Sequence, residues 1–419
     1  MFLKFERRAW TLIYIGLGVV DGGTAAVMIR ALFAGQTSPL AVDLALGLAS
    51  TAPAWSNLAS FAYAGIAQGR PKVGLLYPML IAIAACVAAL ALVPASGAGL
   101  LAFFVLYALA RLLFAGVQTV RSVLWSVNYP RHLRARITGR IMVNTSIAVA
   151  AVSLVLGWLV EHEGPWYRWA IVAAALTGLT GTLAVRRFRV RSEQKLLAEE
   201  TARLGAGATF GWRGMRQLLR DDPAFRHYMF VMSLFGTGNL MVIPLLVVCL
   251  DDVLHLPPFL QMAVATSVPI LVIPIAIWPW AQLLDRHHVV IFRSIQGGVT
   301  VTAVTLYTLA ILGRWPWLLA PGALLMGISM AAGAIGWNLG HNDFARRGEE
   351  TLYMAVHVTL TGIRGLFGPS IAIGLYYGLE SLGSGLGAWA MLLPLALIML
   401  GAYGFVAMRR EHSRGVRQK

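Results

Sequence analysis

Long apolar runs alternate with short polar breaks along the whole chain. A helix of about 20 apolar residues crosses a hydrocarbon core of roughly 30 Å. Apolar runs of at least this length, separated by charged breaks, give twelve candidate membrane spans. They cover residues 10–34, 41–66, 75–94, 97–127, 138–160, 165–185, 226–250, 257–284, 289–313, 315–343, 351–379 and 383–408. The pattern therefore predicts an all-α, multi-pass membrane protein.

Composition agrees with this interpretation and excludes several classes of soluble protein. Hydrophobic residues make up 58% of the chain and charged residues only 12%, whereas ordinary soluble domains carry about 25% charged residues. The two cysteines, Cys86 and Cys249, lie inside apolar runs. Neither a disulfide framework nor a metal or other cofactor site is therefore predicted. The first apolar run is too long for a cleavable signal peptide and is expected to remain as a span.

The net charge of +16 comes from basic residues that are spread over many short loops. A nucleic-acid partner is not expected, because nucleic-acid-binding proteins gather such residues in one patch. Most lysines and arginines fall at the termini and in loops that follow even-numbered spans, whereas the opposite loops hold only Arg30, Arg168 and Arg314. Because cytoplasmic loops retain positive charge, both termini are expected in the cytoplasm and the chain in the inner membrane of a prokaryotic cell.

The longest polar stretch divides six candidate spans from six. It predicts three regions: an N-terminal bundle at 1–187, a cytoplasmic linker at 188–225, and a C-terminal bundle with a short tail at 226–419. Within the linker, apolar residues such as Phe210 and Leu218 alternate with arginines, which is typical of an amphipathic helix at a membrane surface. That helix could rest on its own bundle or bind a partner protein.

Two short segments recur in the two halves of the chain. The segment Gly65–Arg70 ends the second span, and Ala281–Arg286 ends the eighth. Asn128 and Asn342 likewise follow the fourth and tenth spans, each before a basic turn. In both matches the second segment lies about 215 residues after the first, as expected of the internal repeats of many transporters. Together they favour duplication of a six-span unit.

With these features the chain resembles the major facilitator superfamily. That family carries a Gly-x-x-x-Asp-Arg-x-Gly-Arg-Lys type signature between spans two and three, and a degenerate copy between spans eight and nine. Asp285 and Arg286 match the second copy. In the first copy Arg70 and Lys72 are present, but Gly69 stands where the family has an acidic residue.

The resemblance implies two pseudo-symmetric six-helix bundles around a central cavity, which rock to expose that cavity to either side of the membrane. It also implies a cytoplasmic gate at the signature loops. We expect the polar end of the tenth span to join that gate, although ordinary helix capping would explain its residues equally well. The gate candidates are Arg70, Lys72, Asp285, Arg286, His341, Asn342 and Asp343.

Three charged residues lie deep inside candidate spans. A charge at the centre of a membrane helix costs about 2.5–3.5 kcal/mol on insertion scales, and such residues are usually functional. Asp21 lies near the middle of the first span and Arg111 near the middle of the fourth. They could form a fixed ion pair, or Asp21 could carry a proton while Arg111 binds an anion. Arg364, in the eleventh span, has no carboxylate at its depth and is expected to face the cavity or to pair with backbone carbonyls.

Other polar residues lie inside the spans or near their ends. His357 is a second proton candidate, because histidine titrates closest to neutral pH. Several uncharged polar residues could orient a solute, although hydrogen bonds between helices would explain them equally well. They are Gln118, Asn144, Asn239, Gln261 and Asn338.

These features predict a monomeric, proton-coupled secondary transporter of a small organic solute in the lipid bilayer. Two deep arginines against one deep aspartate favour an anionic or zwitterionic solute. One alternative is efflux of amphiphilic compounds by proton antiport, and another is a transporter-like sensor or scaffold. No nucleotide-binding or hydrolase motif occurs in the sequence, so an ATP-driven pump or an enzyme is not predicted.

Overall fold

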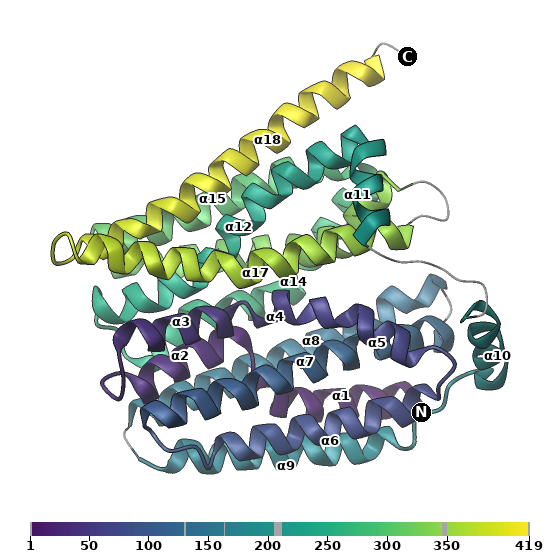
Figure 1. Cartoon of the computed structure of the whole chain (residues 1–419), viewed down its shortest axis with the longest axis horizontal. Coiled ribbons are helices and arrows are strands. Elements are labelled where there is room, and N and C mark those ends of the chain that lie inside the picture. Colours follow the sequence, from purple (N-terminus) through teal and green to yellow (C-terminus); the bar gives the residue numbers. More distant parts are fainter. Residues whose placement is uncertain (1, 130, 163, 205–211, 346–349, 418–419) are drawn as a thin grey trace.

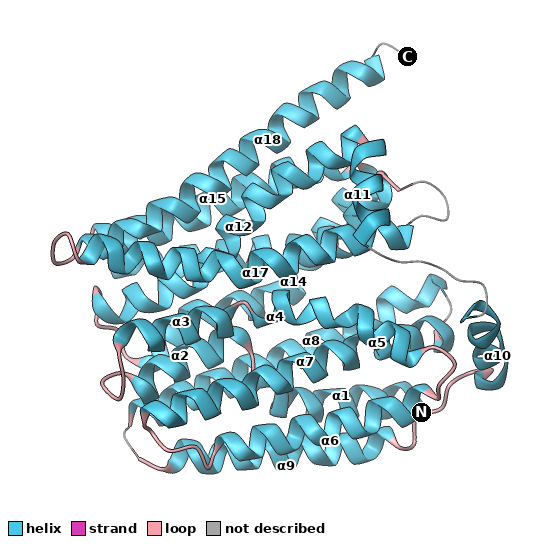
Figure 2. Cartoon of the chain, viewed as in Figure 1, coloured by secondary structure: helices cyan, strands magenta, loops and turns pink. Residues whose placement is uncertain are grey.

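The computed structural model describes residues 2–129, 131–162, 164–204, 212–345 and 350–417. Within these ranges the chain is almost entirely helical and contains no strand, as Figure 2 shows. Eleven helical stretches of the described residues are long and apolar enough to cross a membrane. The prediction of an all-α, multi-pass membrane protein is therefore confirmed.

The N-terminal half consists of ten helical segments that precede the linker. In chain order they are α1 (Phe2–Val19), α2 (Gly22–Phe33), α3 (Pro39–Ser50), α4 (Ala52–Trp55), η1 (Ser56–Ala59), α5 (Ser60–Ala67), α6 (Lys72–Leu90), α7 (Gly97–Asn128), α8 (Arg131–Glu161) and α9 (Trp166–Val185).

The linker contributes two helices, and the C-terminal half follows. The linker helices are α10 (Glu193–Leu204) and α11 (Trp212–Asp221). The C-terminal half contains α12 (Pro223–Asp252), α13 (Pro258–Met262), the π-helical η2 (Ala263–Ser267), α14 (Val268–Arg286), α15 (Val289–Leu312), η3 (Pro316–Leu318), α16 (Leu319–Leu339), η4 (Gly340–Asp343), α17 (Glu350–Glu380), η5 (Leu386–Met391) and α18 (Leu392–Arg417).

The second candidate span, 41–66, is not one continuous helix as expected. It is divided into α3, α4, η1 and α5, and the first interruption lies at Thr51. Pro53 explains this break, because proline has no backbone N–H and disfavours helical geometry in the residue before it. The first candidate span is also interrupted, between Val19 and Gly22. Both interruptions lie close to the boundary between the halves.

Each half forms its own helical bundle. In the N-terminal half α1 packs against α8 and α9, and α6 packs against α7 and α9. In the C-terminal half α12 packs against α17 and α18, and α15 packs against α16 and α18. Figure 1 shows the two halves lying side by side along their length. Both chain ends and both linker helices lie at one end of the bundle, called the proximal end below; the opposite end is the distal end.

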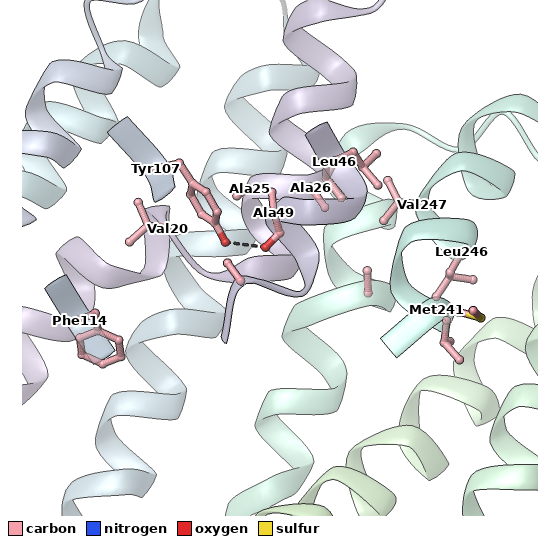
Figure 3. Close-up of a cluster of buried hydrophobic side chains, with 14 of the residues drawn as sticks. Val20, Ala25, Ala26, Leu46, Ala49, Tyr107, Phe114, Met241, Leu246 and Val247 are labelled. Atoms are coloured by element: carbon pink, nitrogen blue, oxygen red, sulfur yellow. Dashed lines mark hydrogen bonds between the residues drawn. The ribbon is translucent and has the colours of Figure 1, made fainter. Parts of the chain in front are cut away.

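The surface and the interior both fit a membrane environment. Large apolar side chains remain exposed, including Leu101, Trp169 and Ile275, and exposed apolar area of this kind is expected against lipid rather than water. Buried apolar residues form a cluster that continues from one half into the other. Figure 3 shows part of it, with Leu46 of α3 near Val247 of α12.

Candidate functional site

Asp21 lies in the interruption of the first span and caps the helix that follows. Its backbone is extended, and its carboxylate accepts a hydrogen bond from the backbone nitrogen of Gly23 at 3.2 Å. A Cβ on Gly22 would lie 2.6 Å from the carbonyl oxygen of Ser50, so glycine lets the start of α2 approach the end of α3. A carboxylate at a helix N-terminus is stabilised by the unpaired N–H groups there.

Arg111 and Tyr107 come from α7, one helical turn apart, and lie in the same region as Asp21. The positive charge of Arg111 acts on the carboxylate of Asp21, although no hydrogen bond or ion pair within 4 Å joins the two in the described chain. Arg111 is buried, its guanidinium lies 5.3 Å from the ring centre of Phe114, and its Nε has no hydrogen-bond partner among the described residues. The Tyr107 hydroxyl donates to the carbonyl oxygen of Ala49 at 2.6 Å, as Figure 3 shows.

Arg364 is buried in α17 and bonds mainly to backbone. Its Nε donates to the carbonyl oxygen of Leu360 at 3.0 Å, and another nitrogen donates to the Thr361 hydroxyl at 2.7 Å. A third nitrogen donates to the carbonyl oxygen of Met232 and so links α17 to α12. Among the described residues no carboxylate pairs with Arg364. The backbone carbonyls therefore provide the compensation that a buried guanidinium requires.

His357 lies deep in the C-terminal half, among other basic residues. It is 2% exposed, its ring makes an edge contact with Trp337 at 5.8 Å between centroids, and neither ring nitrogen has a hydrogen-bond partner in the described chain. Arg364, Arg293 and His341 act on it electrostatically. Arg293 is itself fully buried and donates to Gln296 at 2.6 Å. This part of the half thus concentrates positive charge and nitrogen donors.

The uncharged polar candidates do not gather at one place. Gln118 is half-buried on α7, whereas Asn239 is exposed on α12. Gln261 is buried and donates to the Leu256 carbonyl oxygen at 2.8 Å and to Asp251 at 3.3 Å. Asn144 lines a mostly apolar groove of about 650 Å³ among α1, α8 and α9, away from the boundary between the halves. The side chain of Asn338 lies outside the described part.

The proximal gate candidates have different surroundings. Lys72 is fully buried, and its Nζ donates to the carbonyl oxygens of Ala67 at 2.6 Å and Arg70 at 3.2 Å. Asp343 accepts a hydrogen bond from the backbone nitrogen of Val289 at 2.6 Å, at the start of α15. Three further candidates, Arg70, Asp285 and Arg286, are exposed, His341 is buried, and the side chain of Asn342 lies outside the described part.

A charged network at the distal end, which the sequence did not predict, joins the two halves. The guanidinium of Arg30 pairs with Asp43 of its own half and with Asp251, at 2.9 Å, and Asp252 of the other half. Two tyrosine hydroxyls complete the network: Tyr376 donates to Asp252 at 2.7 Å, and Tyr377 donates to Asp43 at 2.6 Å. The network borders a cavity of about 780 Å³.

Close backbone contacts continue this junction towards the middle of the molecule. Thr51 donates its hydroxyl to the carbonyl oxygen of Gly365 at 2.7 Å, and Ser267 donates to that of Ala150 at 3.2 Å. A Cβ on Gly365 would lie 2.9 Å from the Cβ of Ala54. Small residues allow such close helix packing in membranes. These hydrogen bonds between the halves lie in the middle of the molecule and at the distal end, so the distal end is closed in this conformation.

Comparison with known proteins decides the family. The family model described as Major Facilitator Superfamily matches residues 13–369. The chain belongs to the major facilitator superfamily. The resemblance inferred from the signature loops is thereby confirmed, and so is the fold of two pseudo-symmetric six-helix bundles. No protein of curated function matches the chain in sequence.

Solved structures of several transporters share this fold. The nucleoside transporter NupG (D323A mutant) has a TM-score of 0.70 at 12% identity, covering 97% of this chain and 100% of that one. A D-xylose-proton symporter gives 0.73 at 12% identity, covering 96% and 97%. A POT family transporter in complex with a thioalcohol conjugated peptide gives 0.72 at 13% identity, covering 97% and 96%. At such low identity the likeness shows the fold alone. Together with the family match, it indicates that the chain is a secondary transporter.

Proposed function

We propose that this transporter couples the movement of a small organic anion to protons through Asp21. The supporting observation is the place of Asp21 at the interruption of the first span. Two residues after it, a Cβ on Gly23 would lie 2.0 Å from the Thr266 hydroxyl in η2. The helix that Asp21 caps thus packs against the opposite half. When the halves rock, the surroundings of Asp21 change, and a carboxyl whose surroundings change can take up and release a proton.

Arg111 supplies the link between solute and proton. With no solute bound, the positive charge of Arg111 opposes the desolvation cost of ionising Asp21. A solute carboxylate or phosphate that binds the guanidinium of Arg111 weakens the stabilisation of the ionised Asp21 by Arg111, so Asp21 then binds a proton. With a monoanion bound, the proton on Asp21 restores the neutral net charge of the empty site, whereas solute without a proton would leave a net negative charge that is costly in the low-dielectric interior. Release of the solute reverses the order.

The basic residues of both halves favour a solute with negative charge. Guanidinium groups present a planar fork that fits carboxylate and phosphate. Three nitrogens of the buried Arg364 bond to Leu360, Thr361 and Met232, and its two remaining N–H groups would meet an anion once rocking of the halves opens the site. His357 stays as the second proton candidate because neither of its ring nitrogens has a hydrogen-bond partner among the described residues, although the neighbouring Arg364 disfavours the charged imidazolium.

The distribution of charge supports an orientation in the inner membrane of a prokaryotic cell. Basic residues such as Arg186, Arg187 and Arg409 lie at the proximal end, with both termini. Positive charge is retained on the cytoplasmic side, so we place the proximal end in the cytoplasm and the Arg30 network outside. Because one chain contains every residue of the proposed mechanism, the transporter works as a monomer surrounded by lipid.

The linker helix α11 packs on its own chain, which favours transport over a scaffold role. Leu218 is buried, and the Thr359 hydroxyl of α17 lies 3.7 Å from the sulfur of Met215. The Tyr353 hydroxyl of the same half donates to Asp222 at 2.7 Å. The apolar side of α11 is thus used within the molecule, leaving little of it for a partner protein.

A two-stage experiment tests the proposal. A thermal-shift screen of purified protein against metabolite anions and lipophilic cations identifies a solute, because a ligand that binds only the folded state raises apparent stability. Stabilisation by the cations alone would support efflux of amphiphiles and contradict the anion proposal. Proteoliposomes then compare the wild type with Asp21→Asn, which should keep solute exchange and lose concentrative uptake. Glu161→Gln, at an exposed acid at the end of α8, is the matched control.

A further inference from the structure

A groove on the outside of the N-terminal half is polar at one end and apolar along the rest. α8 and α9 both pack on α1, and the groove of about 650 Å³ lies among the three helices. Ile147 and Val155, each 51% exposed, form part of its wall, so it opens towards lipid. Its polar lining residues are Thr11, Asn144 and Thr177, and in each helix this is the lining residue nearest the proximal end. The groove is therefore amphiphilic, with its polar part towards the proximal end.

The apolar part of the groove has about the length of one lipid leaflet. From Asn144 to Leu156, the α8 axis rises about 18 Å. Half of a hydrocarbon core of roughly 30 Å is about 15 Å. Five alanines keep the space between α8 and α9 open, namely Ala148, Ala151, Ala170, Ala173 and Ala174. A groove of this length and composition fits one acyl chain of a membrane lipid.

Asn144, at the polar end of the groove, lacks a partner for its amide. Its side chain is half-buried and makes no hydrogen bond to another described residue. The hydroxyls of Thr11 and Thr177, by contrast, donate to the carbonyl oxygens of Arg7 at 2.8 Å and Ala173 at 2.7 Å. An amide without a partner is costly in hydrocarbon, where no water is present to bond it. The ester carbonyl oxygens of a phospholipid, which lie between headgroup and acyl chains, would supply the acceptor.

Two arginines continue the polar end of the groove towards the membrane surface. Arg8 lies three residues before Thr11 on α1, and Arg140 lies four residues before Asn144 on α8. At this spacing each arginine lies on the same face of its helix as the lining residue. Both side chains are exposed, and neither makes a hydrogen bond or an ion pair with another described residue. Guanidinium groups bind phosphate, so the entrance of the groove suits an anionic headgroup.

We propose that this groove binds one anionic phospholipid, with its phosphate at Arg8 and Arg140, an ester carbonyl at Asn144 and one acyl chain between α8 and α9. With the proximal end in the cytoplasm, as proposed above, the lipid comes from the cytoplasmic leaflet, where anionic lipids attract basic residues. A second copy of this chain fits the groove less well, because it would bring the same arginines to the contact.

Photolabelling locates the bound lipid. Phosphatidylglycerol with a photoreactive diazirine on one acyl chain is added to the protein in phosphatidylcholine nanodiscs, and labelled peptides are identified by mass spectrometry. The label should concentrate on the groove residues of α8 and α9. A phosphatidylcholine probe with the same chain should label them about thirtyfold less, since each arginine near the membrane surface contributes about fivefold, or about 1 kcal/mol, to binding of an anionic lipid.

Variants test the headgroup and the acyl chain separately. Arg8→Gln combined with Arg140→Gln should lower labelling by phosphatidylglycerol to the level of the phosphatidylcholine probe. Arg410→Gln, at an exposed arginine of α18 in the opposite half, should leave it unchanged. Ala151→Phe fills the groove from an exposed position and should reduce labelling by both probes, whereas Ala102→Phe, at an exposed position of α7, should not.

Three results would overturn the proposal. They are equal labelling of the groove by the two probes, label spread evenly over the lipid-facing helices, and a dimer joined through α8 and α9. The measurement needs neither solute nor transport, and nanodiscs present both leaflets alike. Failure here would therefore leave proton coupling through Asp21 standing, and loss of that coupling would leave the lipid site standing.

Discussion

The Nε of Arg30 donates a hydrogen bond to Asp251 at 2.9 Å across the boundary between the two halves. Arg30 is 8% exposed and Asp43, its partner within the same half, is fully buried. Breaking a buried ion pair costs more than its formation gains, because the remaining charge is left in a poor solvent. The pairs that cross the boundary have carboxylates that are more than a third exposed, so they favour the distally closed conformation by a modest free energy over conformations in which Arg30 and Asp251 are apart.

Replacing Arg30 should open the distal end. Arg30→Gln removes the two ion pairs that cross the boundary, with Asp251 and Asp252, each worth about 0.2–1 kcal/mol for such partly exposed carboxylates. The loss of the Arg30–Asp43 pair, within one half, destabilises both conformations.

The distally closed population should fall, as measured by pulsed EPR between spin labels on cysteines at Leu92 and Leu382, both highly exposed at the distal ends of the two halves. Arg314→Gln, at an arginine that borders the same cavity, is the control. Equal distances in the wild type and Arg30→Gln would show that the network does not hold this end closed.

Adding a methyl group at the boundary between the halves should also lower the distally closed population. Gly365→Ala places a Cβ 2.9 Å from that of Ala54 and 3.1 Å from the backbone nitrogen of Trp55. Overpacking of this kind costs about 1–3 kcal/mol, and it applies only where the halves touch. Gly374→Ala lies in the same helix with nothing within 4 Å of its Cβ. If both variants give the same distance distribution, close contact at Gly365 does not control the conformation.

Tyr129 should stabilise the folded chain in a way that depends on pH. Its hydroxyl donates to the buried carboxylate of Glu6, and burial together with this hydrogen bond raises the pKa of Tyr129. The folded state therefore keeps a proton that the unfolded chain loses above its usual pKa of about 10. The stabilisation is complete below that pH and decreases above it.

Thermal unfolding of Tyr129→Phe measures this contribution. At neutral pH we expect a loss of about 1.5–3 kcal/mol, the usual range for a hydrogen bond to a charged group. The difference from the wild type should shrink as the pH rises above about 10. Tyr403→Phe, at a largely exposed tyrosine of α18, should change little at either pH. A difference that stays constant or grows with pH would contradict the assignment.

Arg364 should discriminate between charged and neutral solutes. In Arg364→Gln, binding of an anionic solute should weaken about tenfold or more, since a charge-assisted hydrogen bond is worth at least about 1.5 kcal/mol. A neutral analogue of the same shape should lose little affinity. Isothermal titration of both ligands checks this, and Arg364→Lys tests whether charge without the planar fork suffices. Equal losses for the two ligands would remove Arg364 from the solute site.

Hydropathy was enough to predict the fold, because membrane spans must satisfy their own backbone and therefore leave a strong local signal. The exceptions have local causes as well. Pro53 accounts for the break at Thr51, and the glycines around Asp21 allow the interruption of the first span. The sequence placed Asp21 near the middle of the first span, among glycines that allow close helix approach or a local break, and in the structure the span is interrupted there, with Asp21 capping α2.

The candidate site was only partly accessible from the sequence. The expectation that Asp21 and Arg111 could meet came from their similar depth in the first and fourth spans and from the family resemblance, which implies that both spans line the central cavity. The Arg30 network was missed because its members come from α2, α3, α12 and α17, and only the packing of the halves brings them together. The available signal was Arg30 and Asp43, opposite charges at facing ends of adjacent spans. Asn144 could not be placed either, because a polar residue does not reveal which face of a helix meets the other half.

The most direct measurement is proton movement driven by solute. Proteoliposomes with a pH-sensitive dye inside receive the identified solute outside, and internal acidification is compared between the wild type and Asp21→Asn. We predict that the wild type moves protons together with solute, whereas Asp21→Asn binds and exchanges solute without moving protons. Proton movement by Asp21→Asn at the wild-type ratio to solute would contradict proton coupling through Asp21.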